Sequence, residues 1–159
     1  MIRLRFVEGQ GIASDLIELR EMVCMPICPS HVECVDPETG KYIGQHASGG
    51  MLARDPGYDA PFKGECFVDL PCSDAQAKAF YDAARAAIGQ AYDIEAIVGF
   101  VIPGHFHVKF EAFCSAKMFL LLRDVADWFP SHVPLCVPAH DIDPRDLLLI
   151  ISAIVEVPH

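Results

Sequence analysis

The sequence lacks a hydrophobic run long enough to cross a membrane. Its longest apolar stretch, residues 147–155, has nine residues and includes Ser152, whereas a membrane-spanning helix needs about 20. The N-terminal segment carries Arg3 and Arg5 without an apolar segment behind them, which is not typical of a secretory signal. The sequence therefore predicts a chain without a membrane span and favours a cytoplasmic location.

Positive charge is also scarce. Lys and Arg number 12 against 22 Asp and Glu, a formal net charge of −10. A surface this acidic repels phosphate backbones, which excludes general nucleic-acid binding. A phosphate-binding glycine loop, a G-x-S-x-G elbow and an H-E-x-x-H pair are absent too. We expect neither a cofactor nor a resident metal ion.

The composition that remains is that of one folded domain spanning residues 1–159. Apolar residues make up 52% of the chain, which excludes intrinsic disorder. Such a high share indicates an apolar cleft or a contact between subunits of a homo-oligomer. The cysteines number 7, an odd count, so free thiols are favoured over a disulfide framework.

Periodicity and capping residues predict a mixture of strands and helices. Apolar residues alternate with charged ones over residues 2–6, as in a half-buried strand. Capping signals predict a helix after Ser73, with Gly89 at its C-terminal end, and a short helix or turn after Asp143. Three further segments are predicted as strands, namely 15–20, 65–70 and, because of its β-branched residues, 150–157.

A β-hairpin is predicted around the loop Pro37–Gly40. Proline presets φ and glycine accepts a positive φ, as a four-residue loop requires. In this register Asp36 faces Lys41, an opposite-charge pair that favours the alignment. His31 then lies opposite His46, with Cβ atoms roughly 5 Å apart. The turn chemistry therefore predicts two imidazoles on one face of the sheet.

A cysteine is predicted at the start of a buried helix. Residues 114–125 are apolar nearly all round, which is typical of a helix inside the core. A helix N-terminus stabilises a thiolate and offers N–H groups to an oxyanion. Cys114, His31 and His46 are therefore candidates for nucleophile, general base and orienting residue. The alternative is that Cys114 is one more small buried apolar residue.

A competing pattern is a zinc site near residue 30. Zinc accepts cysteine and histidine ligands tetrahedrally. However, the knuckle spacing is absent, and residues three apart on a strand point to opposite faces. This hypothesis is therefore weaker than the thiol site, and its four ligands would be Cys24, Cys28, His31 and Cys34.

The motifs resemble those of a known family, the circularly permuted branch of the NlpC-type papain-like hydrolases (YiiX-like proteins), with lecithin:retinol acyltransferase-like enzymes as distant relatives. The segments that carry the resemblance are SHVE (30–33), QHASGGM (45–51), IGQAYD (88–93) and FCSAKM (113–118). Histidine precedes cysteine in the chain, as in the permuted branch. Many permuted members have glutamate where His46 stands, which leaves the reaction class intact and the substrate open.

The resemblance implies an α+β fold, an antiparallel sheet or small barrel packed on a buried helix that carries Cys114 at its N-terminus. It implies a thiol-dependent hydrolase or acyltransferase with a Cys114–His31–His46 triad, acting on a small cell-wall-type peptide or a lipid acyl group. Tyr92 and Ser115 correspond to substrate or oxyanion contacts. Glu33 shares a strand face with His31 and is the second candidate to orient it. The alternative function is a non-catalytic lipid- or peptide-binding module with the same fold.

Overall fold

The computed structural model describes residues 1–9, 27–46, 49–90, 112–131 and 137–155. Five strands form one antiparallel sheet in the order β4-β3-β2-β1-β5. Their bounds are β1 Ile2–Glu8, β2 His31–Val35, β3 Tyr42–His46, β4 Gly50–Arg54 and β5 Gly64–Leu70. The predicted α+β class is confirmed. The alternative of a small barrel is wrong, because the described strands form an open sheet that ends at β4 and β5.

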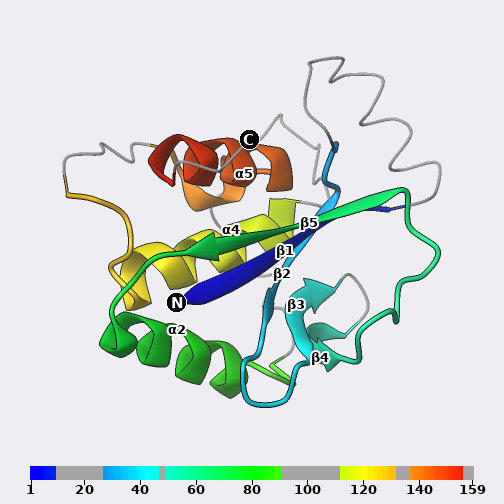
Figure 1. Ribbon diagram of the computed structural model, residues 1–159, viewed down its shortest axis with the longest axis horizontal. Helices are drawn as coiled ribbons and strands as arrows, with labels where there is room; N and C mark the ends of the chain where they lie inside the picture. The colour runs from blue at the N-terminus through cyan, green and yellow to red at the C-terminus, as the bar shows by residue number, and fades with distance from the viewer. Residues whose placement is uncertain (10–26, 47–48, 91–111, 132–136, 156–159) are drawn as a thin grey trace, which may run out of the picture.

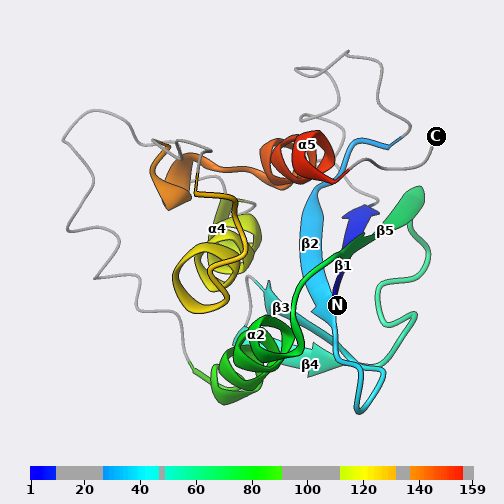
Figure 2. The same cartoon turned by 60° about the vertical axis from the view of Figure 1, so that its left-hand side comes forward.

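The helices lie on one side of this sheet (Figures 1 and 2). They are α2 (Asp74–Ala86), α4 (Ala112–Leu120) with its π-helical extension η1 (Leu121–Val125), the short 3-10 helix η2 (Ala139–Asp141) and α5 (Pro144–Ile154). Helix α4 packs on β2 and β3. None of the helices in the described ranges is long and apolar enough to cross a bilayer.

Capping boxes begin two of these helices where the sequence predicts them. Ser73 accepts from the backbone N–H of Gln76 at the start of α2, and Asp143 does the same for Asp146 at the start of α5. The C-cap of α2 is Ala87 and not Gly89. Gly89 lies two residues further along the chain, with a φ of 80°. Each box satisfies helix N–H groups that have no partner inside the helix.

The strand predicted over residues 150–157 is wrong, since helix α5 continues to Ile154. The Asp143 cap and the proline after it start a helix, and Leu147, Leu148 and Ile151 then bury one face of it. Burial of this face outweighs the β preference of the branched residues. The strand predicted over 15–20 lies outside the described residues.

The core fills the space between the helices and one face of the sheet. Leu4 and Phe6 of β1 pair with Cys34 and Val32 of β2, and all four side chains are fully buried. Successive residues of a strand point to opposite faces, so Arg5 and Glu33 lie on the other face. Cys34, Cys66 and Cys72 are free thiols, as predicted.

Candidate active site

The hairpin places two histidines side by side. The N–H of Asp36 donates to the carbonyl of Lys41 at 2.8 Å, so the loop closes in the predicted register. Pairing continues through Cys34 with Ile43. The rings of His31 and His46 lie with centroids 5.0 Å apart. The predicted juxtaposition of the two imidazoles is confirmed.

The charge pair expected to favour this register is not formed. Asp36 pairs with Arg85 of α2 at 2.5 Å, and Lys41 pairs with Asp55 at 3.4 Å. The two side chains of the turn therefore reach outward to other elements. Backbone geometry, set by Pro37–Gly40 with Gly40 at φ 71°, fixes the register instead.

Cys114 is the third residue of α4 and meets His31 at the start of β2. Cys114 is 3% exposed. Burial lowers the pKa of His31, but the charge of Cys114, a hydrogen bond to Cys114 and the Glu33 carboxylate outweigh burial and raise the pKa to about 10. The structure thus brings a thiol, an imidazole and a carboxylate together from α4 and β2.

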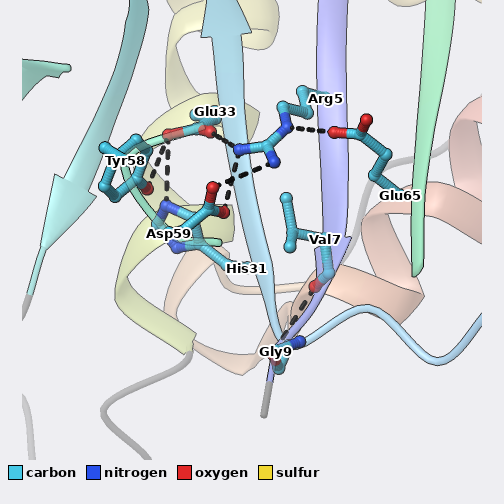
Figure 3. A network of polar contacts seen from close by, with 9 residues as sticks. Arg5, Val7, Gly9, His31, Glu33, Tyr58, Asp59 and Glu65 are labelled. Atoms are coloured by element: carbon cyan, nitrogen blue, oxygen red, sulfur yellow. Dashed lines mark hydrogen bonds and ion pairs between the residues drawn. The ribbon is translucent and has the colours of Figure 1, made fainter. Parts of the chain in front are cut away.

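Glu33, rather than His46, is placed to orient His31. Nε2 of His31 lies 3.5 Å from Oε2 of Glu33, a contact drawn as a dashed line in Figure 3. His46 instead lies ring against ring with His31, tilted by 40°, and its other ring neighbour is Tyr58 at 5.4 Å. Burial and the His31 charge lower the pKa of His46 to about 4. Of the two candidate orienting residues, the carboxylate makes the closer polar contact.

The Glu33 carboxylate belongs to a buried ionic network centred on Arg5 (Figure 3). Nη1 of Arg5 donates to Oε1 of Glu33 at 2.6 Å, and both side chains are at most 1% exposed. The same guanidinium binds Asp59 at 2.9 Å and Glu65 at 2.7 Å. Tyr58 donates its hydroxyl to Oε2 of Glu33 at 3.1 Å.

These contacts decide the charge of Glu33. Burial alone would raise the pKa of Glu33, but hydrogen bonds and charges from His31 and Arg5 outweigh burial and lower it. The carboxylate is therefore ionised and fixed from both ends. A fixed anion beside Nε2 sets the tautomer and the direction of an imidazole.

Gly44 makes room for this arrangement on the neighbouring strand. A Cβ at position 44 would lie 2.8 Å from Cβ of Glu33, and 3.4 Å from both Oε2 of Glu33 and Nε2 of His31. The first distance is shorter than real Cβ contacts. Any other residue at 44 would push into the contact between Glu33 and His31.

Of the two predicted substrate contacts, Ser115 lies among the described residues and Tyr92 does not. The hydroxyl of Ser115 is fully buried and donates to the carbonyl of Ile142 at 2.6 Å. It ties α4 to the segment before α5, so this hydroxyl is not available to a ligand.

The cysteine-rich zinc pattern is not assembled as a site. Cys34 points into the apolar core, whereas His31 faces Glu33 on the opposite side of β2. Cys24 lies outside the described residues. Among the described residues, the potential metal-ligand atom of His31 therefore lies near those of Glu33 and His46 and not near that of Cys34.

Sequence reasoning missed Arg5, Tyr58 and Asp59. The alternation in β1 places Arg5 on the face away from the core, which is correct, but does not indicate that this face is covered. A segment after β4 covers that face, with Asp59 bound to Arg5 and the Phe62 ring 5.2 Å from its guanidinium. The turn dipeptide Pro56–Gly57 was the available signal. It reverses the chain after the strand, so Tyr58 and Asp59, which follow it, can fold back over the sheet.

Comparison of the chain with protein-family models, curated proteins and solved structures found no match.

Proposed function

We propose that the protein is a thiol-dependent hydrolase or acyltransferase acting on an amide or ester bond. Cys114 is the nucleophile, His31 the general base and acid, and Glu33 the residue that orients His31. One observation carries this proposal: His31 lies between the Cys114 thiol and the ionised Glu33 carboxylate. Such a nucleophile, base and orienting acid form the arrangement required for acyl transfer through a covalent intermediate.

The proposed reaction has two half-steps. Nε2 of His31 faces Glu33, so we assign Nδ1 to the thiol of Cys114. His31 already carries the proton of Cys114 as an imidazolium when the sulfur attacks the carbonyl carbon. The proton then passes to the leaving amine or alcohol as the scissile bond breaks and a thioester forms. Water, or another acceptor whose proton His31 takes, cleaves the thioester and restores the thiol.

The first-turn position of Cys114 supports the charge stabilisation that this reaction needs. N–H groups at the beginning of a helix have no partner within the helix and can bind an oxyanion. The His46 ring lies against His31, and the Tyr58 ring lies against His46. They are proposed to exclude water from the imidazole rather than to transfer protons.

The finer assignment follows from the motifs. We propose a permuted papain-like domain, in which the strand that carries His31 precedes the helix that carries Cys114. A small cell-wall-type peptide or a lipid acyl group is the proposed substrate. The high apolar share of the chain favours the acyl group slightly.

Selective alkylation tests the proposal. We expect iodoacetamide at slightly acidic pH to modify Cys114 before the half-buried thiols Cys66 and Cys72, because an imidazolium favours the thiolate and ordinary thiols stay protonated. Peptide mapping by mass spectrometry identifies the modified residue. His31→Ala should slow the modification of Cys114 by about tenfold or more. A matched variant, Cys72→Ser, should leave it unchanged.

One observation favours the alternative of a binding module: the Cys114 residue is 3% exposed, as structural cysteines are. In that case all accessible thiols react slowly, and His31→Ala has no effect on Cys114. That result would reject the enzymatic proposal.

A further inference from the structure

The cluster around His31 contains two ring nitrogens that make no hydrogen bond of normal length, although Nε2 of His31 lies 3.5 Å from Oε2 of Glu33. Nε2 of His31 and Nε2 of His46 are both buried, and neither has a hydrogen-bond partner among the described residues. Buried polar atoms are nearly always bonded, so an exception indicates a missing ligand or a functional role. Two such atoms in adjacent rings point to one shared ligand.

A carboxylate completes the set. The ligand atoms of His31, His46 and Glu33 all lie within 4.8 Å of one another. Tetrahedral Zn²⁺ binds imidazole nitrogen and carboxylate oxygen at about 2.0–2.2 Å, so its ligand atoms lie about 3.4 Å apart. Small side-chain rotations would therefore bring these three groups onto one ion.

The surrounding charge favours a dication. Arg5 brings one positive charge, but Glu33, Asp59 and Glu65 bring three negative charges to it. Once His31 has lost its proton, as a metal ligand must, the network carries two excess negative charges in a part of the protein where both Arg5 and Glu33 are at most 1% exposed. Buried charge requires compensation, and an ion of charge two beside Glu33 supplies it.

Gly44 adds no side chain to the cluster. Gly44 lies opposite Glu33, and a Cβ there would be 3.4 Å from both Nε2 of His31 and Oε2 of Glu33. Glycine therefore keeps clear the place between two of the three ligand atoms. This is independent of the unpartnered nitrogens and points to the same location.

We propose that this cluster binds a divalent transition-metal ion of the Zn²⁺ class, through Nε2 of His31, Nε2 of His46 and Oε2 of Glu33. Three protein ligands leave one position for water or another donor. With a metal ion on Nε2, His31 keeps its Nδ1 proton and no longer accepts one from Cys114. The ion therefore blocks the thiol chemistry reversibly, a consequence that rests on the proposed function; metal binding itself does not.

Calorimetric titration of the EDTA-treated full chain with ZnCl₂ tests the site. The wild type is expected to bind one Zn²⁺ per chain. His46→Phe keeps an aromatic ring beside Tyr58 but removes both nitrogens, and should weaken binding by about 100-fold or more, since even residues that only support a ligand contribute 10–100-fold. His46→Gln serves as a second variant, and both are checked for an unchanged melting temperature without metal.

Two controls separate this site from other zinc-binding groups. Cys24→Ser/Cys28→Ser removes the cysteines of the sequence pattern near residue 30, and Cys114→Ala removes the adjacent thiol. Both should retain binding. Binding that survives in both His46 variants, or that is lost with Cys24 and Cys28, would overturn the proposal, as would no binding to the wild type. Alkylation of Cys114 without metal tests the proposed function separately, so the two can fail independently.

Discussion

Two buried carboxylates on the same hairpin, Glu33 and Asp36, each pair with an arginine but serve different ends. Asp36 is 3% exposed and binds Arg85, whose side chain is 26% exposed. Glu33 is fully buried, as is its partner Arg5. Asp36 also accepts from the Thr39 hydroxyl at 2.6 Å and the Glu38 N–H at 3.2 Å, so it stabilises its own turn.

The partners of Glu33 come from distant parts of the chain. Arg5 is 28 residues away and Tyr58 is 25 away. Asp36, whose turn partners are close in sequence, stabilises that turn. Glu33, whose partners are distant in sequence, fixes how those segments lie relative to one another, and with them the position of His31. The comparison predicts that substitutions in the Glu33 network lower the free energy of unfolding more than substitutions around Asp36, and that they also change the reactivity of Cys114.

The largest expected effect is that of Arg5→Met compared with Arg85→Met. Loss of Arg5 breaks its buried ion pair with Glu33, which costs about 3–5 kcal/mol of unfolding free energy. Loss of the half-buried Arg85 should cost about 1 kcal/mol. Urea unfolding at neutral pH measures both.

A double variant identifies the cause. Arg5→Met with Glu33→Gln should recover part of the loss, because the carboxylates of Asp59 and Glu65 are 19% and 31% exposed and can reach water. Equal costs for the two arginine variants would contradict the distinction drawn between the two carboxylates.

The next comparison is between two glycines of the same hairpin. Gly44→Ala places a Cβ 2.8 Å from Cβ of Glu33, and overpacking of this kind costs about 1–3 kcal/mol. Gly40→Ala meets no atom within 4 Å but must adopt φ 71°, at a cost of about 1 kcal/mol. Both are measured by urea unfolding, with alkylation of Cys114 as the second readout.

Only Gly44→Ala should also slow the alkylation of Cys114, because the added methyl group displaces Glu33 from His31. If Gly40→Ala slows it to the same extent, the effect is general to the hairpin and the assignment of Gly44 to the site is wrong.

The contrast between the two carboxylates also explains how much could be predicted from the sequence. The hairpin register follows from a proline and a glycine within four residues, and the capping boxes of α2 and α5 from residues three apart. Such interactions are local, so spacing alone specifies them. They predict the meeting of His31 and His46, which is half of the candidate site.

The remaining half depends on contacts between distant segments. Alternation places Arg5 on the correct face but cannot show that Asp59 and Phe62 cover it. It likewise places Glu33 beside His31 but not within a buried ion network. The strand predicted near the C-terminus fails for the same reason, since packing of α5 against the core decides its conformation.

The pH dependence of stability sharpens the local side of the comparison. Burial would raise the pKa of Asp36, but the bonds from Arg85 and Thr39 outweigh it and lower the pKa. A lowered pKa stabilises the fold at pH values above the unfolded value of about 3.9, and this contribution is lost as the pH falls from there through the lower pKa of the folded state.

Asp36→Asn should therefore cost about 1–2 kcal/mol at neutral pH, because it removes hydrogen bonds to a charged group. The difference from the wild type should shrink as the pH falls below about 4. Urea unfolding across this range measures it. A difference that stays constant with pH would show that the charge of Asp36 contributes nothing.

The smallest expected change in stability comes from removing one hydroxyl from each network. Tyr58→Phe removes the bond to Glu33, and Thr39→Val removes the bond to Asp36; each should cost about 1 kcal/mol. Their effect on Cys114 should nevertheless differ. Without the Tyr58 hydroxyl, Oε2 of Glu33 loses a donor and His31 is held less firmly, so alkylation of Cys114 slows severalfold. Thr39→Val leaves that rate unchanged, because Asp36 contacts neither histidine of the site. Equal rates of Cys114 alkylation in the two variants would show that the Tyr58 hydroxyl does not help to position Glu33. Arg5 would then be the partner that holds Glu33 toward His31.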